Sequence, residues 1–191
     1  MSNQYSKIII GSRGSDLALW QANFVKNKLE TLGRIVEIKI IQTKGDKIQH
    51  LSFDKIEGKG FFTKEIEKAL IDKEIDLAVH SLKDLETDQP EGLCLGAVPN
   101  RENPSDCLLI NRNAVDELQE LNIKKNAIVG TSSARRKNQF LLFREDLKIQ
   151  DLRGNVPTRV NKLSTGSYDG IVLAKAGLNR LELDLSSFFV V

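Results

Sequence analysis

Two adjacent arginines, Arg135 and Arg136, follow a glycine and three hydroxyl residues in the stretch 130–140, GTSSARRKNQF. The apolar residues before this stretch are typical of a strand. The spacing of the apolar residues after it is typical of a helix, so the arginines fall in the first turn of that helix. A helix N-terminus already carries partial positive charge and free N–H groups, so two cations are unfavourable there unless an anion binds beside them. The stretch therefore predicts an anion-binding site.

Other cations, hydroxyls and one carboxylate lie at the carboxyl ends of predicted strands or just beyond them. They are Arg13, Ser15, Lys83, Asp84, Thr131, Ser133, Arg153, Arg159 and Arg180. Residues that follow parallel strands meet at one edge of a sheet, and the planar donors of arginine match carboxylate or phosphate. A single arginine at a helix start is usually a solvated surface charge. Six arginines in equivalent places instead predict a cleft that holds a ligand with several negative groups.

Asp84 has two interpretations. It is either a turn residue and ion-pair partner of Lys83, or a carboxylate placed for proton transfer or for stabilising a cationic intermediate. His80 lies in an apolar run that predicts a buried strand. A lone histidine without a partner motif is more typical of a structural residue than of a base.

Strand and helix patterns alternate along the chain, with an interruption at 99–104, PNRENP. Strands are predicted at 7–13, 35–43, 75–81, 93–98, 107–111, 127–131, 147–153 and 168–174. Helices are predicted between Ser15 and Gly33 and at 61–74, 114–121, 135–144, 156–163 and 176–181. This order predicts two doubly wound α/β domains with largely parallel sheets, residues 1–99 and 100–191, around an interdomain cleft.

Composition narrows the class of protein. A length of 191 residues, 40% apolar residues and a net charge of +2 are typical of a soluble globular protein. No stretch reaches the roughly 18 consecutive apolar residues of a membrane span, and the N-terminal apolar run is too short for a signal peptide, so we expect a cytoplasmic protein. Two histidines and two cysteines predict no metal cluster and no disulfide framework, and we expect both Cys94 and Cys107 to be buried.

Several segments are similar, in order, to one known family. They are 12–22 (SRGSDLALWQA), 44–46 (KGD), 57–67 (EGKGFFTKEIE), 76–85 (DLAVHSLKDL), 129–139 (VGTSSARRKNQ), 151–163 (DLRGNVPTRVNKL) and 168–181 (YDGIVLAKAGLNRL). Together they resemble porphobilinogen deaminase, also called hydroxymethylbilane synthase. The resemblance implies a transferase of tetrapyrrole (haem) biosynthesis that joins four porphobilinogen units into hydroxymethylbilane and releases ammonia. Each unit carries an acetate and a propionate, which would explain the row of arginines.

The resemblance also implies roles for individual residues. The family extends its product on a dipyrromethane cofactor, and the implied ligands of the cofactor carboxylates are Lys83, Thr131, Ser133, Arg135 and Arg136. The implied ligands of substrate and growing chain are Arg13, Ser15, Arg153, Arg159 and Arg180. Asp84 is implied as the catalytic carboxylate. A mobile loop and the helix after it, which act as a lid, are implied to contain Lys55, Lys59 and Phe62.

One departure from the family concerns its third α/β domain, which carries the cysteine that binds the cofactor. That domain is expected to be absent from this chain, because neither Cys94 nor Cys107 lies in such a motif and the sequence stops at Val191. The family chain also normally returns to add strands to the first domain. We therefore expect a fragment, a truncated gene product or half of a split protein that is inactive alone. The complete enzyme is expected to be a monomer with porphobilinogen as its small-molecule substrate.

Two other classes of function compete with the enzyme. Two α/β lobes around an anion-binding cleft also describe periplasmic solute-binding proteins, so the alternative is a binding module for a polyanionic small molecule without catalysis. A nucleic-acid binder would need a basic face and stacking aromatic residues, which a net charge of +2 and 6% aromatic residues do not favour. No membrane partner is expected.

Overall fold

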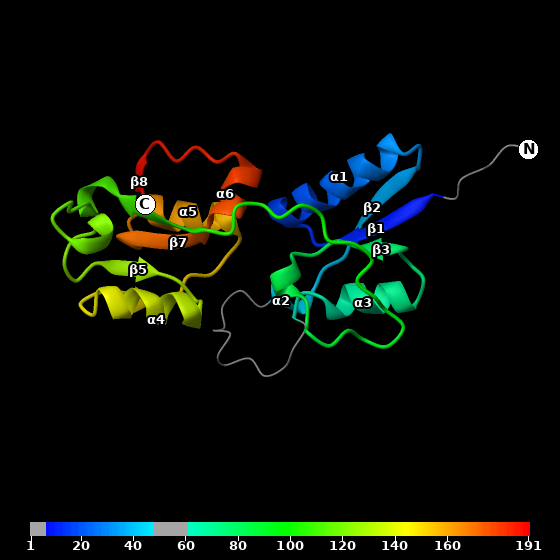
Figure 1. Ribbon diagram of the computed structural model, residues 1–191, viewed down its shortest axis with the longest axis horizontal. Helices are drawn as coiled ribbons and strands as arrows, with labels where there is room; N and C mark the ends of the chain where they lie inside the picture. Colours follow the sequence, from blue (N-terminus) through cyan, green and yellow to red (C-terminus); the bar gives the residue numbers. More distant parts are fainter. Residues whose placement is uncertain (1–6, 48–60) are drawn as a thin grey trace, which may run out of the picture. The chain divides into compact units, whose positions relative to one another are not determined.

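The computed structural model describes residues 7–47 and 61–191 (Figure 1). The described residues form two compact units. Unit 1 contains 7–47 and 61–100, and unit 2 contains 101–191. Each unit is an α/β structure with its own sheet and apolar core. In the described part of the chain, no helix combines the length and apolar character that crossing a membrane requires.

Unit 1 is built on a parallel sheet of three strands. The central strand β1 (Ile8–Ser12) pairs with β2 (Val36–Ile40) on one side and with β3 (Leu77–Ala78) on the other. All three strands run in the same direction, as their sequence pattern predicts. Their carboxyl ends therefore meet at one edge of the sheet, which is where ligands bind in such folds.

Two helices cover opposite faces of this sheet (Figure 1). Ile10 packs with the apolar residues of α1 (Asp16–Thr31), whereas Ile9 packs with those of α3 (Lys64–Ile71). Successive strand residues point to opposite faces, so one strand serves both cores. Helix α1 ends before Gly33, whose φ of 75° is accessible to glycine without strain.

Two predictions for unit 1 differ from the structure. The strand expected at 75–81 forms but is limited to Leu77–Ala78. The strand predicted at 93–98 is wrong, because these residues form no strand. Leu95 and Val98 are 50% and 60% exposed, and Cys94 is exposed, contrary to the prediction of a buried thiol. An apolar run forms a strand only where it pairs with a neighbouring strand, and 93–98 pairs with none of the described strands of unit 1.

Unit 2 contains a mixed sheet of five strands in the order β6-β5-β7-β4-β8. Its strands are β4 (Asp106–Asn111), β5 (Ile128–Gly130), β6 (Lys148–Gln150), β7 (Gly170–Ala174) and β8 (Phe188–Val190). Strand β5 runs parallel to β6 and β7, as predicted, but β4 runs antiparallel to β7 and β8. The first residue of β4 therefore lies at the edge where β5, β6 and β7 end.

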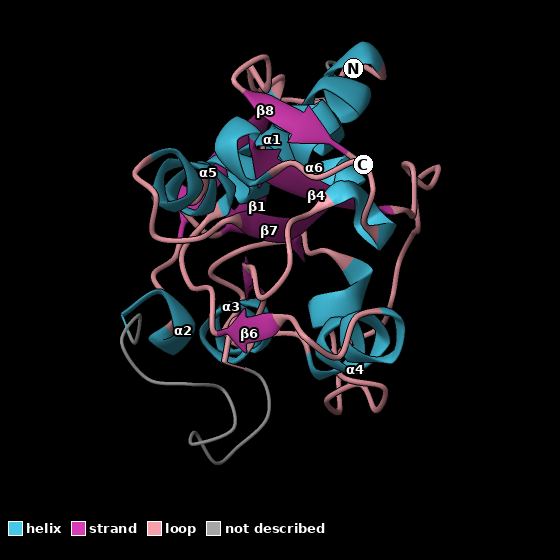
Figure 2. Cartoon of the chain, turned by 90° about the vertical axis from the view of Figure 1, so that its left-hand side faces the viewer, coloured by secondary structure: helices cyan, strands magenta, loops and turns pink. Residues whose placement is uncertain are grey.

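Helix α4 (Ala134–Phe143) covers one face of this sheet, and α5 (Val156–Ser164) and α6 (Lys175–Leu181) cover the other (Figure 1, Figure 2). Alternate residues of β4 enter the two cores: Leu109 packs with the α5 and α6 side, and Leu108 with the side that includes Phe140 of α4. Cys107 is buried, as predicted.

The helix predicted at 114–121 does not form. Two 3₁₀ turns, η3 (Arg112–Ala114) and η4 (Glu120–Asn122), occupy this stretch, and Leu121 has a φ of 63°. Because β4 is antiparallel, it ends at the edge where β5 begins, so the connection between them needs no crossover helix. Helix α2 (Lys44–Lys47) is one further turn, in a segment for which the sequence predicts neither a helix nor a strand.

Candidate functional site

A small cavity of about 50 Å³ lies in unit 1, beyond the carboxyl ends of β1 and β3. Arg13, Ser15, Phe62 and Asp84 line it, so the structure brings together four of the residues that the sequence singles out. Gln21, His80 and Ser81 complete the polar part of the wall. Lys55 and Lys59, predicted to belong to the same lid as Phe62, lie outside the described residues.

Arg13 is held on two sides. Its Nε donates to Asp46 Oδ1 at 3.0 Å, and its Cζ lies 4.0 Å from the centroid of the Phe62 ring. Asp46 in turn accepts a hydrogen bond from the Thr43 hydroxyl at 2.8 Å. Burial alone would raise the pKa of the Asp46 carboxyl, but Arg13 and Thr43 outweigh it and hold this pKa below its ordinary value. Asp46 belongs to the KGD motif at 44–46, but the sequence assigns it no role, and the structure makes it the partner of Arg13.

Asp84 and Lys83 lie in a single 3₁₀ turn, η2 (Leu82–Asp84), which begins just after Ser81. The turn is closed by the Asp84 N–H, which donates to Ser81 O at 2.9 Å. Both Asp84 and Lys83 are exposed residues, and only Asp84 contributes to the cavity wall. Ser15 occupies the N-cap of α1 but makes no side-chain capping hydrogen bond, so its hydroxyl is available to a ligand.

His80 lies two residues beyond β3 rather than inside a buried strand. It is half-buried, and among the described residues its Nε2 atom has no hydrogen-bond partner. Burial lowers the pKa of His80 and the charge of Arg13 adds to this, while Glu67 and Asp84 oppose it. The imidazole of His80 in the cavity wall is therefore neutral at neutral pH. The sequence favoured a structural role for this residue.

In unit 2, the hydroxyl residues after β5 form the N-terminus of α4. Ser133 caps the helix, with its Oγ 3.5 Å from the N–H of Arg136, and Thr131 Oγ1 accepts from the Ser133 N–H at 3.2 Å. A Cβ added to Gly130 would lie 2.9 Å from the ring of Tyr168, so glycine is needed at this crossing. These contacts direct the two arginines of the first helical turn along the edge of the sheet.

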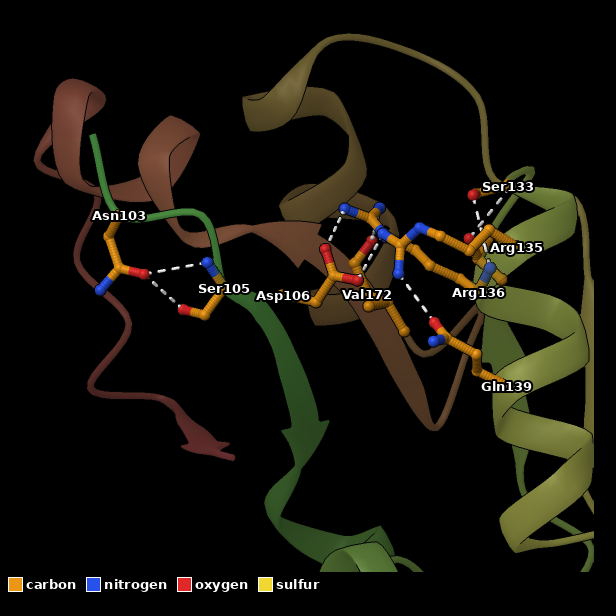
Figure 3. Close-up of polar contacts among 9 residues, drawn as sticks. Asn103, Ser105, Asp106, Ser133, Arg135, Arg136, Gln139 and Val172 are labelled. Carbon is orange, nitrogen blue, oxygen red and sulfur yellow. Dashed lines mark hydrogen bonds and ion pairs between the residues drawn. The ribbon is translucent and has the colours of Figure 1, made fainter. Parts of the chain in front are cut away.

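Arg135 and Arg136 converge on one carboxylate, that of Asp106 at the start of β4 (Figure 3). The terminal nitrogens of Arg135 and Arg136 each lie 2.7 Å from one of its oxygens. A second contact fixes each arginine: Arg135 donates to Gln139 Oε1 at 2.7 Å and Arg136 to Val172 O at 3.0 Å. Burial alone would raise the pKa of Asp106, but Arg136 and Arg135 outweigh it and hold this pKa below its ordinary value.

Two further predicted residues, Arg153 and Arg159, come after β6 at the same edge. Arg159 Nε donates to Gly154 O at 2.7 Å. Burial lowers the pKa of Arg159, and the positive charges of Arg136 and Arg153 lower it further. Such mutual repulsion is typical of a site that binds an anion, because an anion relieves it. Arg180, the last predicted residue, lies half-buried in α6.

In unit 2, Asp106 is absent from the sequence predictions, because those concern the carboxyl ends of strands and Asp106 begins one. For a strand that runs antiparallel to its neighbours, the residue at its start lies at the edge where those neighbours end. The sequence signal for Asp106 was an acidic residue directly before the strand predicted at 107–111. This signal points to the site only if the strand runs antiparallel to its neighbours, and the local sequence does not reveal the direction of a strand.

Comparison with known proteins assigns the chain to a family. Residues 8–189 match a family model described as "porphobilinogen deaminase, dipyromethane cofactor binding domain". The chain belongs to the porphobilinogen deaminase family. Porphobilinogen deaminase of Nitratiruptor sp. is 54% identical over 92% of this chain and 55% of its own length. That of Clostridium novyi is 48% identical over 96% of this chain and 62% of its own length.

The chain thus spans somewhat more than half the length of these curated relatives. Solved structures show the fold independently of sequence. An ancestral cationic amino acid solute binding protein matches 97% of this chain and 76% of its own, with a TM-score of 0.51 and 13% identity. An ancestral arginine-binding protein gives a TM-score of 0.50 at 14% identity, over 97% of this chain and 78% of its own. The predicted fold class, two α/β lobes of the solute-binding type, is confirmed.

Proposed function

We propose that this chain takes part in the synthesis of hydroxymethylbilane from porphobilinogen, as a deaminase that binds the carboxylates of pyrrole units through its arginines. The observation that carries the proposal is the cationic edge of unit 2. There Arg136, Arg153 and Arg159 lie close enough for the first two to lower the pKa of the third. The acetate and propionate groups of porphobilinogen are the anions that such donors match.

The residues of unit 2 fit the dipyrromethane cofactor of the family. Its carboxylates require donors in several directions, and Arg135, Arg136 and the hydroxyls of Thr131 and Ser133 provide them around the start of α4. When bound, the cofactor supplies the pyrrole end to which porphobilinogen is added. Lys83 of unit 1 would contribute a further cation.

In unit 1, we assign the chemistry to the cavity that Asp84 lines. Arg13 and Ser15 in the same wall would bind a substrate carboxylate, and Asp84 would face the pyrrole nitrogen. A carboxylate in this place can accept a proton and stabilise positive charge that develops as ammonia leaves. Arg153, Arg159 and Arg180 would bind the other carboxylates of the growing chain. The prediction that the arginines of both units line one cleft stays a prediction, as do the cytoplasmic location and the monomeric state.

Binding of porphobilinogen tests the proposal directly. We expect titration calorimetry at low ionic strength to show binding to the chain, and Arg159→Gln to weaken it at least about 10-fold, because a charge-assisted contact is lost. Arg112→Gln is the matched control, since Arg112 donates to Ser186 O beyond the opposite end of β4 and should leave binding unchanged. Equal affinity of the wild type and Arg159→Gln would contradict the assignment. A positive reaction of the purified protein with acid Ehrlich reagent would show bound pyrroles independently.

The alternative, a binding module without catalysis, shares the arginines but has no need of Asp84. In the presence of all components that turnover requires, we expect Asp84→Asn to lower ammonia release at least ~10²-fold while porphobilinogen still binds. Unchanged turnover would show that Asp84 is a turn residue. Binding of porphobilinogen without ammonia release by any form of the protein would favour the binding module.

A further inference from the structure

We propose that Asp106 is a resident counter-ion that competes with ligand carboxylates for Arg135 and Arg136, and so sets the affinity of this arginine pair. The inference rests on the proposed function, because it assumes that the pair binds a carboxylate. It adds a residue that begins a strand to a site otherwise built from residues that come after strands.

The contacts of Asp106 are those that a ligand carboxylate would make. One carboxylate bridges two guanidinium groups, each oxygen lying 2.7 Å from a terminal nitrogen of a different arginine (Figure 3). This bridging arrangement uses the strongest type of hydrogen bond available to arginine. A ligand carboxylate that approaches Arg135 and Arg136 must therefore displace the Asp106 carboxylate or share the arginines with it.

The backbone holds Asp106 firmly at this place. Asp106 is opposite Ala174 in the β4–β7 ladder, and the preceding residue Ser105 accepts a hydrogen bond from the Lys175 N–H at 3.0 Å. Asn103 Oδ1 also accepts from the N–H and the hydroxyl of Ser105, at 2.9 and 2.7 Å (Figure 3). The competing carboxylate is thus fixed by the register of the sheet and does not depend on a loop.

The arginines keep their positions without Asp106. Arg136 retains its bond to Val172 O and Arg135 its bond to Gln139, so displacement of the carboxylate leaves both guanidinium groups in place. The side chain of Asp106 is 30% exposed, that of Arg136 13% and that of Arg135 59%, so solvent reaches both the acid and Arg135. A rotation of the Asp106 side chain therefore suffices to open the pair to an external carboxylate.

Charge determines the direction of the effect. Arg135, Arg136 and Asp106 sum to one positive charge, and the pair alone carries two. A ligand carboxylate in the wild type gains the attraction of both arginines only after an existing ion pair has been broken. Removing the charge of Asp106 without changing its size should therefore strengthen binding of a dicarboxylate, by about 10-fold for charge pairs at this distance.

The experiment compares the full chain with Asp106→Asn and Glu117→Gln, using porphobilinogen and, separately, glutarate as probes in calorimetric titrations at pH 7 and low salt. Glu117→Gln removes one negative charge from an exposed residue beyond the opposite end of β4, so it controls for net charge. We expect the dissociation constant of Asp106→Asn to fall about 10-fold and that of Glu117→Gln to stay unchanged. A fold-change shared by both variants would overturn the inference, since net charge alone would explain it.

Equal or weaker binding by a folded Asp106→Asn, with binding by the wild type intact, would also overturn the inference and leave the proposed function standing. No binding of either probe to any of the three proteins would overturn both. A second measurement uses the wild type alone, so it does not depend on the folding of a variant. The ¹³Cγ resonance of Asp106 should move toward that of a free carboxylate as porphobilinogen is added. A resonance that stays in place at saturation would show that the ligand does not displace Asp106.

Discussion

The guanidinium group of Arg13 contacts both the Phe62 ring and the Asp46 carboxylate, with its Cζ 4.0 Å from the ring centroid and its Nε 3.0 Å from Oδ1. The three residues come from segments far apart in the sequence. The ring supplies a cation–π attraction, and the carboxylate supplies an ion pair. Since both fix the same cation, a change in either contact should alter how Arg13 faces the cavity.

Gly45 provides a test of this packing. A Cβ at this position would lie 2.2 Å from the Phe62 ring, so the ring must shift away from its place over Arg13. We expect Gly45→Ala to lower the free energy of unfolding by about 1–3 kcal/mol, as overpacking does. Gly96→Ala is the control, because nothing lies within 4 Å of a Cβ added there. Equal stabilities of the two variants in urea denaturation would contradict this packing.

The pKa of Asp46 provides a second test. Because the folded-state pKa lies below the unfolded value of about 3.9, the unfolded chain takes up the proton first as the pH falls. The contribution of this carboxylate to stability is therefore complete above about pH 4 and is lost as the pH falls through the folded pKa. We expect Arg13→Gln to raise the pKa of Asp46, as followed by its ¹³Cγ resonance. A pKa that is the same in both proteins would show that Arg13 does not hold Asp46.

Helix caps give a third test. Asn155 caps α5 by accepting from the Thr158 N–H at 2.9 Å, whereas Ser15 occupies the N-cap of α1 without a side-chain hydrogen bond. We expect Asn155→Ala to cost about 0.5–2 kcal/mol of stability and Ser15→Ala clearly less. Denaturant titrations of both variants measure the difference. A larger loss for Ser15→Ala would mean that its hydroxyl does cap α1 in solution.

Thiol reactivity gives a fourth test. Cys94 is exposed and Cys107 is buried in β4, where burial raises the pKa of its thiol against the opposing charge of Lys175. At pH 8, we expect Ellman's reagent to modify Cys94 quickly and Cys107 only after unfolding, because the thiolate is the reactive form. Cys94→Ser should abolish the fast phase. Two fast thiols in the native wild type would contradict the burial of Cys107.

The success of the sequence predictions depended on how local each signal is. Helices α1 and α3 and strands β1, β2 and β5 lie inside the predicted segments because the periodicity of apolar residues is set by the element itself. The predictions of a strand at 93–98 and of a helix at 114–121 were wrong because the structure of these segments depends on partners elsewhere in the sheet. A strand needs a neighbour, and a crossover helix is needed only between parallel strands.

The same distinction holds for the candidate site. Arg13, Ser15 and Asp84 could be grouped from sequence because each comes after a strand of one parallel sheet. Asp106 could not, because the direction of β4 is a property of the whole sheet. Asp46 lies in the KGD motif, but its role could not be predicted, because the sequence predicts neither a helix nor a strand there and contains no sign that a turn of helix brings its carboxylate to Arg13.

The register of β4 has a consequence for folding fidelity. Leu108 and Leu109 enter different cores, so a slip of one residue along β7 would exchange the two sets of apolar side chains. The same slip would carry Asp106 about 3.4 Å along the strand and leave Arg135 and Arg136 facing each other without a counter-charge. A misregistered chain would thus suffer mispacking and charge repulsion together. The register of β4 on β7 is thus specified both by the packing of apolar side chains and by the ion pairs of Asp106. The arginine pair at the edge of the sheet therefore has its counter-charge only when the two cores are packed correctly.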